Sequence, residues 1–199
     1  EEFIPEPKTE SNNKLTYSTK LTEFLNQELF AFVSANYRTS DFKLGIGHSL
    51  GGTFLLYEAF KVNSPFGAII AASPNTTLSG MSKMISEYLD EFPAMSTFLY
   101  ITGGDNDEME RIFLKTTVQI DSAISARKSE FPDWNFRKYD HANHMETFPN
   151  TFNDGYLLFS QKWNVTANDL VGFKDLQDTL LEREIKKCFQ RKSILRKSE

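Results

Sequence analysis

The amino-acid sequence predicts an α/β fold built on a parallel sheet, and three observations support this prediction. Short apolar runs alternate with segments whose apolar residues recur every three or four positions, which is the pattern of strands alternating with helices. One run, residues 66–72, is apolar throughout, as in a parallel strand covered on both faces. A Gly-x-Ser-x-Gly motif at residues 47–51 lies between a predicted strand and a predicted helix.

The first half of the chain is predicted to contain two helices and two strands. Residues 1–18 hold two prolines and no periodic pattern, so we expect an irregular segment there. Apolar residues from Leu21 to Val33 recur at helical spacing and predict a helix that ends near Tyr37. The elements that follow are a strand at 42–46, a helix at 50–60 and a strand at 66–72.

The second half of the chain continues the alternation of helices and strands. Residues 75–95 are predicted to form a loop and a helix, either as a cap or pocket wall at the carboxyl edge of the sheet or as an ordinary surface helix. The elements that follow are a strand at 97–102, a helix at 109–124, a strand at 135–139 and a helix at 148–163. We expect residues 1–163 to form one α/β domain and residues 164–199 to form a helical, charged C-terminal extension.

The composition argues against several classes of protein. The 199 residues carry a net charge of −5, so we expect no nucleic-acid partner. No run of 18 apolar residues is present, so we expect no membrane-spanning segment. Cys188 is the only cysteine, which excludes an internal disulfide. The residue pattern implies no metal and no organic cofactor, and it leaves the oligomeric state and the compartment open.

The Gly-x-Ser-x-Gly motif is typical of a sharp strand-to-helix turn, the nucleophile elbow, that exposes a reactive serine. Ser49 is therefore the candidate nucleophile. We expect a side chain at Gly47 or Gly51 to collide across the turn, and the small Gly52 to let the helix pack close to the sheet. Because the helix directs its N-terminal N–H groups at the serine, the Leu50 N–H is expected to stabilise an oxyanion.

A serine nucleophile needs a neighbouring base and a carboxylate that orients the base. The candidate acids follow the strand at 97–102 and are Asp105, Asp107 and Glu108. The candidate bases follow the strand at 135–139 and are His141 and His144. The order serine, acid, histidine is the one that α/β-type serine hydrolases use. His48 is too close to Ser49 along the chain to act as its base, so we expect it to form a wall of the turn.

Residues 21–163 resemble the putative-esterase branch of the α/β-hydrolase superfamily, which includes esterase D, feruloyl esterases and enterochelin-type siderophore esterases. Three motifs carry the resemblance: Gly47 to Gly52, the Gly-x-x-Asp of Gly104 to Asp107, and Asn143-His144 with Pro149 and Asp154-Gly155-Tyr156-Leu157 downstream. The last spacing favours His144 over His141 as the base. The Gly-x-x-Asp spacing favours Asp107 as the acid, with Asp105 as the alternative.

The resemblance implies a serine esterase that cleaves small carboxylic esters through a Ser-His-Asp triad. An acyltransferase with the same triad and a non-catalytic interaction module are the alternatives. In this superfamily the elbow follows the fifth of eight strands, yet no strand is predicted before residue 42. We therefore expect the C-terminal part of the fold, strands five to eight, with the elbow strand at a sheet edge and one oxyanion donor missing. Such a fragment alone is expected to be inactive or poorly soluble.

Overall fold

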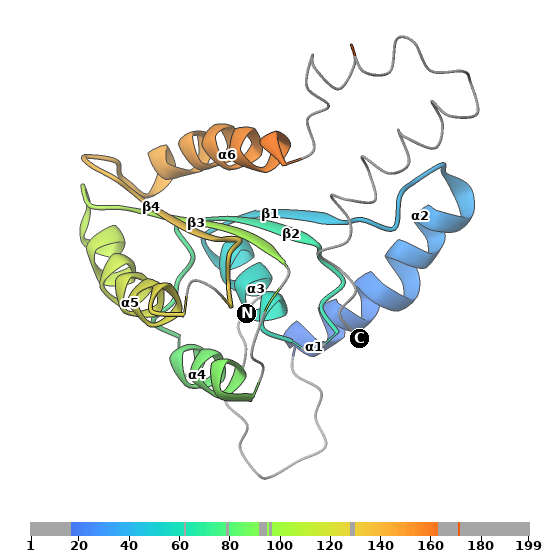
Figure 1. Ribbon diagram of the computed structural model, residues 1–199, viewed down its shortest axis with the longest axis horizontal. Coiled ribbons are helices and arrows are strands. Elements are labelled where there is room, and N and C mark those ends of the chain that lie inside the picture. Colours follow the sequence, from blue (N-terminus) through green and yellow to red (C-terminus); the bar gives the residue numbers. More distant parts are fainter. Residues whose placement is uncertain are drawn as a thin grey trace. The chain divides into compact units, whose positions relative to one another are not determined.

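The computed structural model describes residues 17–162 apart from 62, 79, 92–94, 96, 128 and 129, and also describes Val171. Its elements alternate as the sequence predicts, and the four strands belong to one compact unit, Glu1–Gly155 (Figure 1). In chain order they are α1 (Tyr17–Glu23), the π-helical segment η1 (Phe24–Leu29), α2 (Phe30–Asn36), β1 (Leu44–His48), α3 (Leu50–Ala59), β2 (Ala68–Ala72), α4 (Met81–Glu91), β3 (Phe98–Gly104), α5 (Glu108–Ser125), β4 (Trp134–Tyr139) and α6 (His144–Gln161).

The sheet has the order β1-β2-β3-β4, and all three strand pairs are parallel. The predicted parallel sheet is therefore confirmed. Every residue of β2 and β3 is buried, which explains why the run at 66–72 is apolar without interruption. Because parallel strands end at the same edge, the segments after β1, β2, β3 and β4 lie together, and the candidate site residues come from those segments.

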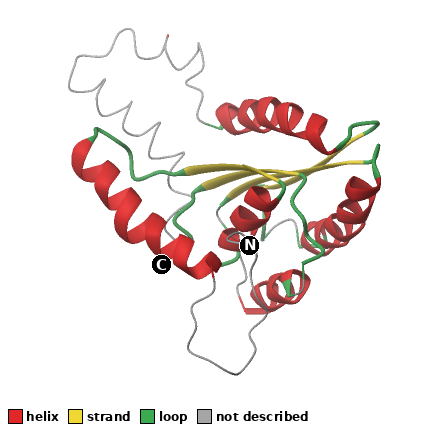
Figure 2. Cartoon of the chain, turned by 180° about the vertical axis from the view of Figure 1, so that it is seen from behind, coloured by secondary structure: helices red, strands yellow, loops and turns green. Residues whose placement is uncertain are grey.

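Helices cover both faces of the sheet (Figures 1 and 2). On one face, α3 packs so closely on β1 that a Cβ added at Gly45 would lie 2.6 Å from the Leu55 side chain. On the other face, a Cβ added at Gly155 of α6 would lie 2.7 Å from the Tyr100 ring and 2.9 Å from Ile70. The close approach on each face shows that glycine sets the spacing between helix and sheet.

Helix α4 packs as a structural element of the core. Its apolar face buries Met81, Ile85 and Leu89 in the same cluster as residues of α3, β2 and β3. Of the two interpretations of residues 75–95, the structure thus favours the surface helix that packs on the core over the cap. The segment predicted as one helix up to Tyr37 is found as α1, η1 and α2 in direct succession.

Strand β1 lies at one edge of the sheet in the described part of the chain, as predicted. It bonds to β2 through the Lys43 carbonyl, which accepts from Gly67 N–H at 3.0 Å, and through the Ser49 N–H, which donates to Ala72 O at 2.9 Å. Parallel pairing alternates, so the backbone groups of Leu44, Ile46 and His48 face away from β2.

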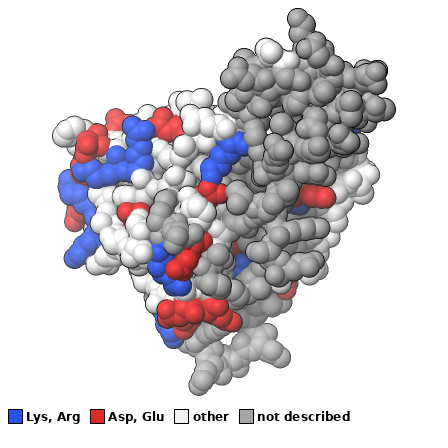
Figure 3. Space-filling view, in the orientation of Figure 1, with Lys and Arg blue, Asp and Glu red and all other residues white. Residues whose placement is uncertain are grey.

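Acidic and basic side chains are interspersed on the visible face of the described residues (Figure 3). Ion pairs among the described residues include Arg137 with Asp154 at 2.8 Å and Lys138 with Asp105 at 2.8 Å. Among the described residues, no helix is both long and apolar enough to cross a membrane.

Candidate active site

Ser49 occupies a strained turn between β1 and α3. Its backbone φ is 55° and its ψ is −121°, a conformation that a non-glycine residue adopts only when its surroundings hold it there. The Ser49 N–H donates to Ala72 O at 2.9 Å, and the Ser49 carbonyl accepts from Thr53 N–H at 2.9 Å. No described residue forms a hydrogen bond with the Ser49 hydroxyl, which leaves that hydroxyl open to a reaction partner.

The glycines around Ser49 differ in how much space a side chain would have. A Cβ added at Gly47 would lie 2.6 Å from the Gly51 carbonyl carbon and 2.8 Å from Gly52 N, so this position has no room for a side chain. A Cβ added at Gly52 would lie 3.1 Å from Gly47 O. At Gly51, by contrast, an added Cβ meets nothing within 4 Å. The expectation of a collision at Gly51 is wrong, because a Cβ at this position would enter open space.

His144 is the first residue of α6, and its ring packs against His48, the residue that precedes Ser49. The two ring centroids are 4.5 Å apart, and the Phe113 ring meets His144 edge-on at 5.8 Å. His141 instead lies in an exposed turn with a φ of 63°. Of the two predicted bases, the structure therefore brings His144 next to the serine-bearing strand.

The carboxylate that faces the His144 ring is Glu110, with Oε1 2.5 Å from Nδ1. The prediction that Asp107 or Asp105 holds this ring is wrong. Asp107 accepts hydrogen bonds from the backbone N–H groups of Glu110 and His144, both at 2.7 Å. Asp105 accepts from the His141 N–H at 2.7 Å and pairs with Lys138.

The reason for this difference is the start of α5. Asp107 is the N-cap of that helix, so its carboxylate is turned back onto the first backbone N–H groups and away from the ring. Glu110 stands three residues later, in the first turn, and its side chain is fully buried and directed toward the sheet. The spacing Asp107-x-x-Glu110 is a capping pattern, and it is the signal in the sequence that could have identified Asp107 as the cap.

Glu110 is surrounded by hydrogen-bond donors. Its Oε2 accepts from the Gly104 N–H at 2.5 Å and from the Ser73 hydroxyl at 2.9 Å, while Oε1 faces His144. Ser73 is itself buried, has a φ of 41°, and lies 2.8 Å from the Thr147 hydroxyl. A buried carboxylate is stable only when such donors replace water. Because the carboxylate accepts, Nδ1 of neutral His144 carries the proton and Nε2 keeps a lone pair.

The other ionisable groups near the site have identifiable environments. Burial lowers the pKa of His48, whose Nε2–H donates to the His144 carbonyl at 2.9 Å. The Glu110 backbone N–H holds the pKa of Asp107 below its usual value, and the Lys138 ammonium does the same for Asp105. Both aspartates are therefore ionised at neutral pH, and His48 is neutral.

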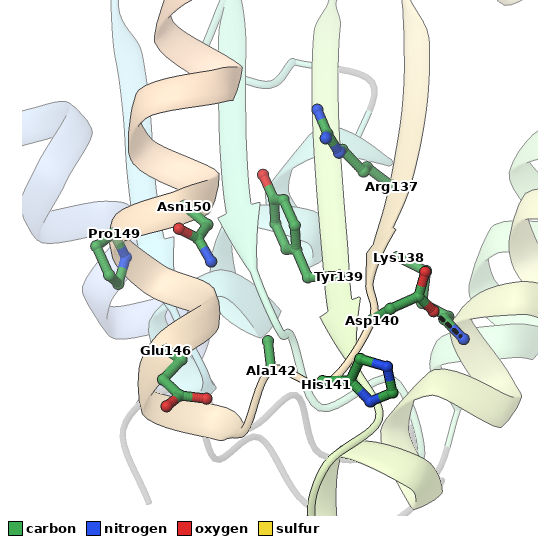
Figure 4. Close-up of a pocket in the computed structure, with 9 residues that line it drawn as sticks. All are labelled: Arg137, Lys138, Tyr139, Asp140, His141, Ala142, Glu146, Pro149 and Asn150. Carbon is green, nitrogen blue, oxygen red and sulfur yellow. Dashed lines mark ion pairs between the residues drawn. The ribbon is translucent and has the colours of Figure 1, made fainter.

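A pocket separate from Ser49 and His144 lies at this edge of the sheet. It has a volume of about 460 Å³ and lies where β4 meets the start of α6 (Figure 4). Its walls include Arg137, Lys138 and Glu146, and neither Ser49 nor His144 lines it. The described residues contain no group of three or more histidine, cysteine, aspartate or glutamate side chains placed to hold a metal ion.

The chain is similar to known proteins in sequence and in fold. A family model described as Putative esterase matches residues 3–147. The chain belongs to the Putative esterase family. The resemblance identified from the three motifs is thus confirmed, and the match covers the strained serine, Glu110 and His144. No curated protein sequence matches the chain.

Several solved structures have a fold similar to that of this chain. They include the siderophore hydrolase EstA from Aspergillus nidulans, with a TM-score of 0.63 and 19% identity over 79% of this chain and 62% of that one. An IroE-like serine hydrolase from Shewanella oneidensis has a TM-score of 0.67 and 12% identity over 89% of this chain and 56% of that one. The BES protein from Bacillus cereus has a TM-score of 0.59 and 20% identity over 77% of this chain and 60% of that one. The chain spans 56–62% of the length of these three structures.

Proposed function

We propose that this chain carries the nucleophile, base and acid of a serine esterase that acts on small carboxylic esters. The observations that carry the proposal are the contact between Glu110 and His144 and the strained turn at Ser49. The acid binds Nδ1 of the base at 2.5 Å, and the base packs against the residue that precedes the serine. Membership of the Putative esterase family supports an ester as the substrate.

In this proposal each group has its own step in acyl transfer. Ser49 Oγ attacks the ester carbonyl carbon, and Nε2 of His144 takes the hydroxyl proton. Leu50 begins α3, so its N–H has no partner within the helix and can donate to the oxyanion. His144 then returns the proton to the leaving alcohol, and water releases the acyl group by the same route. The Glu110 carboxylate stabilises the imidazolium that forms in each half-reaction.

We further infer that β1 to β4 correspond to strands five to eight of the α/β-hydrolase sheet. The serine turn follows β1, as the elbow follows the fifth strand in that fold, and the similar structures are longer than this chain. In that fold the second oxyanion donor comes from the loop after the third strand. Such a donor lies outside β1 to β4, and we assign the Leu50 N–H to the first half of the oxyanion hole.

Labelling with a fluorophosphonate, followed by peptide mass spectrometry, tests the nucleophile in a protein that contains this chain together with the second oxyanion donor. We expect one modified residue, Ser49, and no modification in Ser49→Ala. Hydrolysis of a p-nitrophenyl ester should fall by several orders of magnitude in the same variant. Labelling at another serine, or hydrolysis that survives in Ser49→Ala, would contradict the proposal.

The acid has its own test in a matched pair of substitutions. Glu110→Gln keeps the size of the side chain but removes the charge that stabilises the imidazolium, so we expect the labelling rate to fall by about 10⁴-fold. Asp105→Asn removes a carboxylate of the neighbouring loop that touches neither His144 nor Ser49, and the rate should change by less than about tenfold. Equal rates for the two variants would rule out Glu110 as the acid.

A further inference from the structure

The backbone N–H and the backbone carbonyl of His144 are both held by side chains that form no hydrogen bond with its ring nitrogens. Its N–H donates to Asp107 Oδ2 at 2.7 Å. Its carbonyl oxygen accepts from His48 Nε2–H at 2.9 Å and from the Thr147 hydroxyl at 2.8 Å. The backbone of the proposed base is therefore fixed independently of the hydrogen bond between its ring and Glu110.

Asp107 divides its two carboxylate oxygens between the acid and the base. Oδ1 accepts from the Glu110 N–H, and Oδ2 accepts from the His144 N–H. The His144 N–H belongs to the first turn of α6, where backbone donors have no partner within the helix. Asn143 Oδ1 accepts from the Met145 and Glu146 N–H groups at 3.0 and 3.1 Å, which leaves the His144 N–H to Asp107.

His48 provides the corresponding link to the nucleophile. It is the last residue of β1 and directly precedes Ser49, so its bond to the His144 carbonyl joins the serine-bearing strand to the start of α6. Because Nε2 donates in this bond, neutral His48 carries its proton there. A neutral neighbour is required at this position, since a second positive charge 4.5 Å from the His144 ring would oppose formation of the imidazolium.

We propose that Asp107 and His48 are positioning residues that hold the His144 peptide between the acid and the nucleophile. The effect of these residues on the reaction rate rests on the proposed function, whereas the hydrogen bonds themselves do not depend on it. A displacement of a reacting group by about 1 Å can cost about 100-fold in rate. The two residues thus act on the reaction through the backbone of the base and touch neither substrate nor reacting atoms.

The substitution Asp107→Ser separates positioning from helix capping. Serine is a good N-cap, so it can still accept from the Glu110 N–H, but it has no second oxygen for the His144 N–H. We expect amide hydrogen exchange, followed by NMR, to show lost protection at His144 and retained protection at Glu110. The limiting rate of Ser49 labelling should fall by about 10- to 100-fold, with an unchanged pH midpoint of the labelling rate.

The exchange and labelling measurements distinguish failure of the positioning role from failure of the proposed function. Retained protection of the His144 amide in Asp107→Ser would overturn the positioning role, whether or not Ser49 reacts. Loss of that protection with a wild-type labelling rate would also overturn it. If wild-type Ser49 is never labelled, the proposed function fails, while the exchange result still decides whether Asp107 holds the peptide. If Asp107→Asn and Glu110→Gln have the same Ser49 labelling rate and the same pH midpoint of that rate, Asp107 rather than Glu110 alone would have the role of the acid.

His48 is tested by a pair of substitutions that differ in one hydrogen-bond donor. Glutamine can place an amide N–H near the position of Nε2, whereas leucine fills similar volume without a donor. We expect His48→Leu to lower the labelling rate by about tenfold and His48→Gln to restore most of it. His141→Asn, at the exposed histidine, serves as the matched control. A wild-type rate in His48→Leu, or equally slow rates in both His48 variants, would contradict the role of this bond.

Discussion

The two glycines of the Gly-x-Ser-x-Gly motif should respond in opposite ways to the same substitution. Gly47→Ala places a Cβ 2.6 Å from a backbone carbon of Gly51, about 0.8 Å closer than the 3.4 Å at which ordinary contacts begin. Gly51→Ala places a Cβ in open space within α3. The pair is informative because the change in composition is identical and the sites are four residues apart.

The expected magnitudes follow from these contacts. At Gly47 the neighbouring atoms are backbone, so no side chain can rotate away, and we expect a loss of about 1–3 kcal/mol in the free energy of unfolding. At Gly51 alanine restricts the unfolded chain and favours the helix, so we expect a gain of about 0.5–1 kcal/mol. The two variants should therefore differ by about 1.5–4 kcal/mol, with Gly51→Ala the more stable.

Urea unfolding followed by circular dichroism measures both free energies of unfolding. Equal dependence of the free energy on urea concentration in the two variants shows that they expose the same surface on unfolding, so their stabilities can be compared. Thermal midpoints should separate by about 2–4 °C for each kcal/mol. A Gly47→Ala variant as stable as wild type would refute the steric argument. A Gly51→Ala variant as unstable as Gly47→Ala would show that the motif needs both glycines for the fold.

Three further predictions concern stability. Burial lowers the pKa of His48, so the unfolded chain binds a proton more readily than the folded chain, and stability should fall as the pH drops below the ordinary histidine value of 6.5. The urea midpoint should therefore be lower at about pH 5.5 than at about pH 7.5, and this difference should be smaller in His48→Gln. Glu58 is buried and accepts from Lys61, so Glu58→Ala should cost about 1–3 kcal/mol in urea unfolding, and a loss below about 0.5 kcal/mol would contradict this. Lys138 pairs with Asp105 at the surface, so Lys138→Met should cost less than about 1 kcal/mol, and a larger loss that persists in high salt would be inconsistent with an exposed pair.

The order of elements and the strained serine could be predicted because each depends on residues close together in the sequence. The continuous apolar run at 66–72 predicted a strand covered on both faces, and β2 is buried throughout. The Gly-x-Ser-x-Gly spacing predicted a sharp strand-to-helix turn at Ser49, and the structure has one there, with a φ of 55°. Strand, turn and helix preferences are local properties, so a single chain is enough to find them.

The partners of His144 were decided only by the tertiary structure. Which carboxylate reaches Nδ1 depends on where the start of α5 lies relative to the start of α6, 34 residues away in sequence. The sequence offered three acidic residues after the strand at 97–102 as candidates. In the structure Asp107 caps α5, and the carboxylate of Glu110 faces the His144 ring instead. The bond from His48 to the His144 carbonyl spans 96 residues. Such contacts arise from the packing of helices onto the sheet, which no local pattern of residues encodes.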